Sequence, residues 1–334
     1  MTNPSRTFFL LSSIMGVIYS TSSTSWLASW IGLELNLISF IPIMFSPKNI
    51  YKSEAALKYF LIQALGSSII LFWAPMLLFS TEKTSNMILL SSLTLKLGAA
   101  PFHLWLPSVM QGLSWPQCFL LLTMQKIAPL VLISYLEMSE IIIWMIYWSS
   151  CLSAMIGGLG GLNQTFIRKI MAYSSINHLG WMMSAFCFSE WSLINYFLIY
   201  SFISLSIVSI FHSNEIFHLS NIISTPFFKS MQLLIFIPLF SLGGLPPFLG
   251  FFPKLLLISN LIFQNNFIWT LILTMSALFT LFFYLRILMS SILMSSPKMK
   301  FNKIPSSWDW NFFLSLSAMN FFPIIFPLLS FPVF

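Results

Sequence analysis

Apolar runs of about 20 residues follow one another along almost the whole chain, with only short polar segments between them. A helix of about 20 residues spans the hydrocarbon core of a bilayer and satisfies its own backbone hydrogen bonds there. Of the 334 residues, 57% are hydrophobic and only 7% are charged, whereas a soluble domain carries roughly a quarter charged residues. The sequence therefore predicts an all-α membrane protein and excludes a soluble fold.

Eleven transmembrane helices are predicted, and they form a single transmembrane domain over residues 1–334. The apolar runs between polar breaks lie near 7–22, 25–45, 57–80, 86–106, 117–136, 142–160, 170–188, 192–211, 231–258, 267–289 and 311–332. With this number of helices, the N-terminus lies on the same side of the membrane as the connections that follow even-numbered spans. The C-terminus lies on the other side.

Basic residues outside the spans collect on the side of the N-terminus. The other side has Lys83 alone, whereas the first side carries Arg6, Lys48, Lys52, Lys58, Arg168, Lys169, Lys229, Lys298, Lys300 and Lys303. Cytoplasm-equivalent loops carry such an excess of lysine and arginine, so the N-terminus is predicted to lie in that compartment. The same asymmetry explains the formal net charge of +7. We therefore expect phospholipids, and no nucleic acid, as partners.

A motif of glycine and proline, G-x-x-P-F-x-x-x-x-P, occurs in the fourth and in the ninth predicted span. Its residues are Gly98, Pro101, Phe102 and Pro107 in the first copy and Gly244, Pro247, Phe248 and Pro253 in the second. Proline removes a backbone donor, so both helices should be broken. Copies five spans apart cross the membrane in opposite directions, which predicts two inverted five-helix repeats, 1–137 and 138–290, followed by a loop and a C-terminal helix in 291–334.

Paired helix breaks at matching positions of two repeats are typical of a transport path. The alternative is that glycine and proline are simply more frequent in membrane helices than in soluble ones.

Four charged residues lie deep within the predicted spans: Glu34, Lys96, Lys126 and Lys254. An ionisable group at the bilayer centre costs about 2.5 to 3.5 kcal/mol on insertion scales, and this cost makes each of them a functional candidate. Burial disfavours the charged form of a lysine and a nearby carboxylate favours it, so a lysine beside a glutamate can bind and release a proton. We therefore predict a proton relay in which Glu34 is the partner of Lys96.

Structural explanations stay open for each of these residues. The lysines can extend their ammonium groups to a membrane interface, and Glu34 can belong to a static buried salt bridge. His103 and His178 are secondary candidates for the relay, because an intramembrane histidine serves equally well to satisfy a helix carbonyl.

The cysteines of the chain do not form a pattern that binds a cofactor. Cys118, Cys151 and Cys187 lie in apolar stretches, without CxxC spacing and without a neighbouring pair of histidines. This argues against disulfides, iron–sulfur clusters and metal sites. A dinucleotide-binding fingerprint and a haem ligand pair are also missing from the sequence. We expect that this chain itself binds no cofactor.

Six motifs resemble those of a known family. They are WIGLELNLISF around Glu34, SEAALKYFLIQ from Ser53, KLGAAPFHLWLP around Lys96, QKIAP around Lys126, GGLNQTFIRKIMAYSSINHLGWM from Gly160 and GGLPPFLGFFPK ending at Lys254. With them nearly the whole chain resembles the subunit 2 family of mitochondrial NADH:ubiquinone oxidoreductase (complex I), in an arthropod-like version. This family is similar to the membrane subunits of cation/proton antiporters.

The resemblance implies a proton-translocating, antiporter-like core subunit, in which Glu34 and Lys96 form a pair, Lys126 is the central lysine and Lys254 is the distal lysine. It implies that NADH, FMN, iron–sulfur clusters and ubiquinone belong to other subunits of this oxidoreductase, and it leaves room for structural lipids. The chain would then carry out no redox chemistry itself. Relative to bacterial members, it is shorter by three N-terminal spans, which leaves open how the front of the subunit is sealed.

The partners implied by the resemblance are neighbouring antiporter-like subunits and small membrane subunits of complex I. The implied location is the mitochondrial inner membrane, with the N-terminus in the matrix and the C-terminus in the intermembrane space. Two other functions stay open at this point. The chain can be an autonomous cation/proton antiporter, or it can be a structural spacer for assembly in which the buried charges have no role.

Overall fold

The structure is a computed structural model, and it describes residues 4–47, 49–78, 82–224, 229–293 and 320. In these residues the regular elements are fourteen α-helices and one 3₁₀ helix, with one isolated β-bridge between Phe166 and His218. The predicted all-α class is confirmed. The chain divides into two compact units, Met1–Ser153 and Ala154–Phe334. The two sequence repeats are predicted to meet between residues 137 and 138. This boundary divides the chain by repeat and not by compactness, and it stays a prediction.

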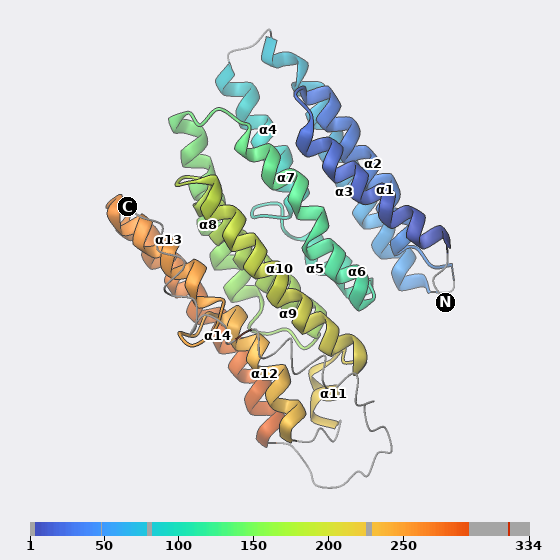
Figure 1. Cartoon of the computed structure of the whole chain (residues 1–334), viewed down its shortest axis with the longest axis vertical. Coiled ribbons are helices and arrows are strands. Elements are labelled where there is room, and N and C mark those ends of the chain that lie inside the picture. Colours follow the sequence, from blue (N-terminus) through green and yellow to red (C-terminus); the bar gives the residue numbers. More distant parts are fainter. Residues whose placement is uncertain (1–3, 48, 79–81, 225–228, 294–319, 321–334) are drawn as a thin grey trace. The chain divides into compact units, whose positions relative to one another are not determined.

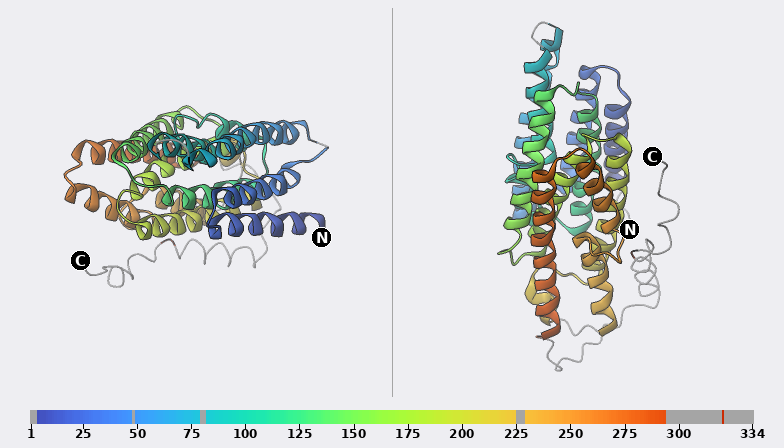
Figure 2. Two further views of the ribbon diagram at one scale, coloured as in Figure 1. Left: turned by 90° about the horizontal axis from the view of Figure 1, so that it is seen from above. Right: turned by 90° about the vertical axis from the view of Figure 1, so that its left-hand side faces the viewer.

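The first unit contains seven complete helices, one 3₁₀ helix and most of an eighth helix (Figure 1). These are α1 (Pro4–Ser22), α2 (Trp26–Met44), α3 (Ile50–Trp73), η1 (Pro75–Leu78), α4 (Glu82–Leu97), α5 (Trp105–Gly112), α6 (Trp115–Leu122), α7 (Met124–Ser134) and α8 (Glu140–Gly160). Figures 1 and 2 show α1 and α2 side by side along their length, and α3 and α4 also pack against each other.

Polar side chains fix where the long helices of this unit begin. The Ser25 hydroxyl accepts the backbone N–H of Ala28 at 3.3 Å and caps α2. The Asn49 side chain accepts the N–H of Tyr51 at 3.1 Å and caps α3. Each cap satisfies one of the N–H groups that a helix start leaves without a partner.

Close backbone contact joins α1 to α2. A Cβ atom added at Gly32 of α2 would lie 2.6 Å from the backbone nitrogen of Ser20 on α1. This distance is shorter than any normal contact, so the two helices can approach this closely only where the side chain is a hydrogen atom. The α1–α2 hairpin is therefore a tightly packed pair.

The second unit contains the end of α8 and six further helices. These are α9 (Ile167–Ala185), α10 (Glu190–Ser213), α11 (Leu219–Ser224), α12 (Lys229–Gly243), α13 (Phe251–Phe263) and α14 (Phe267–Leu293). In this unit α10 packs against α9, α12 and α13, and α14 packs against α9 and α12. Ser189 caps α10 by accepting the N–H of Ser192 at 3.3 Å.

A basic side chain holds the connection between α8 and α9. The guanidinium of Arg286, on α14, donates hydrogen bonds to the carbonyls of Leu162 and Gln164, the latter at 2.8 Å. Ile167, the first residue of α9, donates its N–H to Phe217 at 3.0 Å. The two guanidinium bonds give Arg286 a structural role, because they occupy carbonyls of the loop between α8 and α9.

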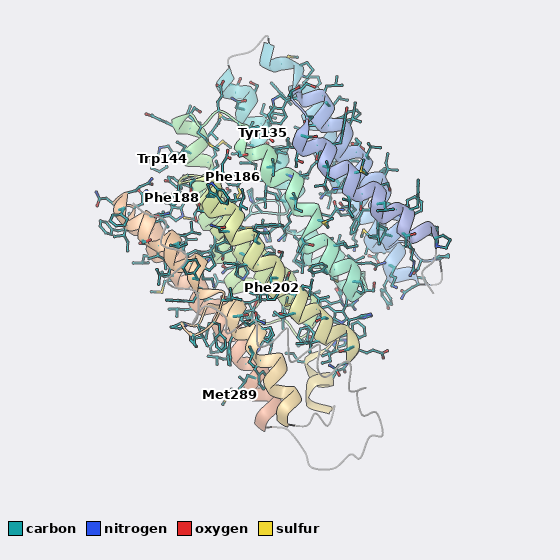
Figure 3. The ribbon with its side chains drawn as sticks, in the orientation of Figure 1. Tyr135, Trp144, Phe186, Phe188, Phe202 and Met289 are labelled. Carbon is teal, nitrogen blue, oxygen red and sulfur yellow. The ribbon has the colours of Figure 1, made fainter. Side chains whose placement is uncertain are left out.

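Apolar side chains cover much of the exposed surface. Large side chains such as Trp144, Leu198 and Ile268 are 65%, 58% and 80% exposed. Trp144 stands clear of the ribbon in Figure 3, and so does Met289. So many exposed large apolar side chains are typical of a protein that contacts lipid or other proteins.

Six described helical segments are long and apolar enough to cross a membrane. They are Trp26–Met44, Ile50–Trp73, Trp115–Ser134, Glu140–Gly160, Glu190–Ser213 and Phe267–Met289. The chain is thus an all-helical membrane protein with several apolar spans. Of the eleven predicted spans, the last, near 311–332, lies outside the described residues except for Asn320.

The contact at Gly32 generates a stability prediction. Gly32→Ala places a methyl group against the backbone of α1, and such overpacking costs roughly 1–3 kcal/mol of folding free energy. We expect a lower thermal midpoint for the purified assembly that contains the variant.

Ala28→Val is the matched control, because it also enlarges a small side chain of α2 but at a partly exposed position. Equal thermal midpoints for Gly32→Ala and Ala28→Val would show that α1 and α2 leave room for a methyl group at position 32.

Candidate functional site

Lys96 lies at the end of α4, where the helix stops at a glycine. Gly98 has a φ of +74°, in the left-handed region, and its N–H donates to the carbonyl of Thr94 at 3.0 Å. Glycine adopts this conformation without steric cost, so it ends the helix here. The chain resumes as a helix only at Trp105, the first residue of α5.

Two side chains donate to carbonyls in the last turn of α4. The indole N–H of Trp105 donates to Leu95 at 3.0 Å, and the Gln63 amide on α3 donates to the carbonyl of Lys96 itself at 3.2 Å. An unpaired carbonyl in an apolar environment costs several kcal/mol. The end of α4 is therefore held by α3 and by α5.

The structure brings Lys96 and Glu34 into the same region of the first unit. Lys96 is only 5% exposed. Glu34, on α2, is partly exposed, and its carboxylate interacts electrostatically with the Lys96 ammonium. The two side chains do not form an ion pair. Among the described residues the ion pair at contact distance is Lys58 with Glu54, 2.6 Å apart, and both of these side chains are exposed.

Lys126 lies in the first turn of α7 and is 2% exposed, so its side chain is almost completely buried. The predicted span 117–136 consists of two helices here, α6 and α7. They meet at Thr123, whose φ of −115° and ψ of −75° depart from helical values. The N–H of Lys126 donates to the carbonyl of Thr123 at 3.0 Å, which starts the new helix.

A partly buried polar chain, not predicted from the sequence, lies next to Lys126. The Tyr59 hydroxyl, on α3, donates to the Gln125 side chain at 3.0 Å, and the Gln125 amide donates to Asn36 on α2 at 3.0 Å. The Tyr59 ring also contacts the Trp105 ring, with centroids 5.9 Å apart. These residues connect α2, which carries Glu34, and α7, which carries Lys126, with α3. Their only signal in the sequence is a polar residue within an apolar run.

Lys254 occupies a different position in the second unit, at the C-terminal end of α12. Gly244 ends this helix with a φ of +82°. The Lys254 ammonium, on α13, donates to the carbonyls of Leu242 at 3.2 Å and of Gly243 at 2.9 Å. It also lies 5.7 Å from the centre of the Trp181 ring. The C-terminal end of a helix carries partial negative charge, so α12 and Trp181 together stabilise the ammonium group.

The two histidines have different surroundings. His178, on α9, is buried, and its Nδ1 lies 2.9 Å from the Tyr196 hydroxyl. His103 lies between α4 and α5 and is partly exposed. Its Nδ1 lies 3.2 Å from the carbonyl of Pro101, which can only accept, so this nitrogen carries the proton. His178 belongs to the same helix as Trp181, and His103 follows the helix end that carries Lys96.

Each unit thus has a buried lysine beside an interrupted helix. The first has a carboxylate within electrostatic range and a chain of neutral polar groups, whereas the second uses helix carbonyls and an aromatic ring. Among the described residues no group of three or more His, Cys, Asp or Glu side chains could hold a metal ion. What these sites can do is hold or exchange protons in an apolar environment.

Comparison with known proteins decides the family. The sequence profile of the NADH:quinone oxidoreductase/Mrp antiporter transmembrane family matches residues 23–280. The chain belongs to this family. The family likeness drawn from the six sequence motifs is confirmed.

A curated relative from Anopheles gambiae, NADH-ubiquinone oxidoreductase chain 2, is 48% identical over 303 residues and covers 88% of each protein. Two members of solved assemblies share the fold. A chain of respiratory complex I from Thermus thermophilus is 21% identical with a TM-score of 0.85, and the match covers 97% of this chain and 80% of that chain. A chain of the Mrp complex from Dietzia sp. is 16% identical with a TM-score of 0.76, over 94% and 73% of the two chains.

The indole of Trp105 generates a prediction that concerns stability alone. Trp105→Phe keeps an aromatic ring but removes the indole N–H that the carbonyl of Leu95 accepts besides the N–H of Gly98, and a lost hydrogen bond costs about 0.5–1.5 kcal/mol. We expect a lower thermal midpoint for the assembly.

Trp148→Phe makes the same change at a side chain that is 66% exposed. It should leave the midpoint unchanged. If both variants melt at the same temperature as the parent protein, the hydrogen bond from the Trp105 indole to Leu95 does not stabilise the end of α4.

Proposed function

We propose that this chain is a proton-translocating membrane subunit of an NADH:ubiquinone oxidoreductase of the complex I type, in the mitochondrial inner membrane. The family and the chain 2 relative support the assembly to which it belongs. The observation that carries the proton-transfer function is the burial of three lysines, Lys96, Lys126 and Lys254, at 5%, 2% and 4% exposure. An amine is too costly to bury in this way without a use for its charge.

In the first unit, Glu34 and Lys96 are proposed to act as a pair. A carboxylate near a buried ammonium stabilises the protonated form, and withdrawal or neutralisation of that carboxylate removes the stabilisation. The electrostatic interaction without a direct ion pair suits this role, because a tight salt bridge would hold both charges permanently. A change of charge near Glu34 can then release a proton from Lys96.

Lys126 and Lys254 are proposed as the following proton carriers, and His103 and His178 as secondary members of the relay. Lys254 has acceptors already in place for its charged form. His178 can exchange a proton through either ring nitrogen, and its Nδ1 is held by Tyr196. Redox chemistry with NADH, FMN, iron–sulfur clusters and ubiquinone belongs to other subunits, which would include neighbouring antiporter-like and small membrane subunits.

We also propose the finer architecture predicted from the sequence. Eleven spans form two inverted five-helix repeats, 1–137 and 138–290, followed by 291–334, and the fourth and ninth spans are broken. The ends of α4 and α12, at Gly98 and Gly244, support the two breaks. The excess of lysine and arginine on one side supports a matrix N-terminus and a C-terminus in the intermembrane space.

A second candidate function is cation/proton exchange by the chain alone. The shared fold with the Mrp complex chain favours this possibility. Ion transport by the purified chain in liposomes would support it. A chain that transports ions only within a larger assembly fits the complex I function instead.

Replacement of Lys126 tests the proposed relay. A positioned proton-transfer group contributes about 10²- to 10⁴-fold to its step, so Lys126→Met should remove the share of pumping that depends on this chain. The measurement is the number of protons translocated per NADH oxidised, by the intact complex in vesicles.

Lys58→Met is the control, because it removes a lysine that is exposed and paired with Glu54. Full pumping by the assembled Lys126→Met complex would instead favour the structural spacer.

The proposed orientation can be tested with single cysteines. Lys52→Cys at the start of α3 should react with a membrane-impermeant thiol reagent only from the matrix side. Ser189→Cys before α10 should react only from the opposite side, as measured in mitoplasts and in inverted vesicles. The reverse pattern would contradict the assigned topology.

A further inference from the structure

A buried asparagine from the far end of the sequence, Asn320, contacts the helix break of the second unit. It belongs to the eleventh predicted span, and its exposure is 0%. Its backbone carbonyl accepts the N–H of Leu249 at 3.1 Å. The Ser241 hydroxyl has two acceptors, the carbonyl of Pro238 at 2.7 Å and the side-chain Oδ1 of Asn320 at 3.3 Å. Burial of an amide is costly unless hydrogen bonds replace its hydration, and these contacts replace part of it.

The two partners of Asn320 lie on opposite sides of the α12–α13 connection, residues 244–250. Ser241 is in the last turn of α12, and Leu249 comes two residues before the start of α13. The two sides also meet directly, because a Cβ atom added at Gly250 would overlap the carbonyl oxygen of Ser241. Asn320 therefore bonds to both ends of a tightly closed connection.

The last turn of α12 also carries the acceptors of the Lys254 ammonium. They are the carbonyls of Leu242 and Gly243, at 3.2 and 2.9 Å, and these two residues directly follow Ser241. Lys254 comes four residues after Gly250, about one helical turn into α13. Hydrogen bonds of this kind span about 2.7–3.2 Å between nitrogen and oxygen. Any opening of the connection therefore separates the ammonium from its acceptors.

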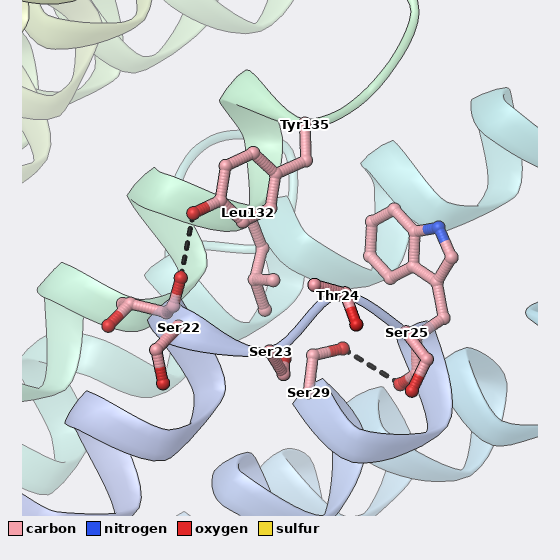
Figure 4. A pocket seen from close by; sticks show the side chains of 9 residues that line it. Ser22, Ser23, Thr24, Ser25, Ser29, Leu132 and Tyr135 are labelled. Atoms are coloured by element: carbon pink, nitrogen blue, oxygen red, sulfur yellow. Dashed lines mark hydrogen bonds between the residues drawn. The ribbon is translucent and has the colours of Figure 1, made fainter.

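Polar residues from distant parts of the sequence also hold other helix ends. In the first unit, the Gln63 amide donates to a carbonyl in the last turn of α4. The Tyr135 hydroxyl, which lines a pocket where α1 ends, donates to the carbonyl of Thr21 at 2.7 Å (Figure 4). At the end of α12 the ammonium of Lys254 is the donor, and Asn320 supplies acceptors instead. The contribution of Asn320 is therefore the position of the connection.

We propose that Asn320 is a positioning residue for Lys254, which holds the α12–α13 connection closed so that the carbonyls at the end of α12 stay within reach of the ammonium. It acts through Ser241 and Leu249. This inference rests on the proposed function, in which Lys254 carries protons. It makes a residue of the last predicted span part of the Lys254 site, and it ties the stabilisation of the ammonium by the helix end to that residue.

Replacement of the Asn320 amide tests this role in the intact complex in vesicles. Asn320→Leu has nearly the same shape but removes an acceptor of the Ser241 hydroxyl. We expect fewer protons translocated per NADH oxidised, with a loss no larger than that of Lys254→Met. In a Lys254→Met background, Asn320→Leu should cause no further loss, because a positioning residue acts only through the lysine that it positions.

Hydrogen–deuterium exchange measures the connection itself. The peptide that contains Leu249 should exchange its amide hydrogens faster in the Asn320→Leu complex than in the parent complex, because the connection opens more often. This measurement does not depend on proton transfer by Lys254.

Asn260→Leu is the matched control, because it makes the same change at a partly buried position of α13 outside the connection. It should leave both the protons per NADH and the exchange of the Leu249 peptide unchanged. Ser241→Ala removes the hydroxyl donor of the same contact. It replaces Asn320→Leu if the latter does not assemble, with the same two expected results.

Three results would overturn the inference. They are full pumping by the assembled Asn320→Leu complex, a further loss of pumping in the Lys254→Met background, and parental exchange of the Leu249 peptide. Failure of the proposed function is distinguishable, because it shows as full pumping by Lys254→Met. In that case faster exchange in Asn320→Leu would still assign the closure of the connection to Asn320, and only the role of Lys254 would be lost.

Discussion

The requirement that every backbone polar group find a partner in an apolar environment governs this structure. A continuous helix meets it automatically, and the two glycine-terminated helix ends do not. At the end of α4, donors arrive from Trp105 and Gln63. At the end of α12, the donor is the ammonium of Lys254. The places where helices stop are therefore also the places where polar side chains have to gather, and proton chemistry becomes possible there.

The two units stabilise a buried ammonium in different ways. Lys96 has a carboxylate at a distance, and its helix end is satisfied by neutral donors. Lys254 is itself the donor that satisfies a helix end, with the Trp181 ring nearby. A charge supported by a distant carboxylate responds to that carboxylate, whereas a charge bonded to carbonyls responds to the geometry of the helix. The two copies of the glycine–proline motif therefore lie beside lysines whose charges respond to different changes in their surroundings.

The sequence predicted the membrane fold, the family and the burial of the lysines, because apolar runs and isolated charges are visible residue by residue. It placed a helix break in each glycine–proline motif because of the prolines, and α4 and α12 end next to Gly98 and Gly244 of these motifs. It could not show the interruption at Thr123, which has no glycine and depends on how α6 and α7 pack. It also could not show the bonds between Gln125 and its partners on α2 and α3, since these residues are far apart in the chain and only the fold brings them together.

The hydroxyl of Tyr135 has a mechanical consequence. It ties the last turn of α7 to the last turn of α1, and α1 is locked to α2 by the contact at Gly32. Because this hydrogen bond holds the end of α7, axial displacement of α7 either moves the α1–α2 hairpin with it or breaks the bond. While the bond is intact, small shifts of α7 at Lys126 are therefore transmitted to α2.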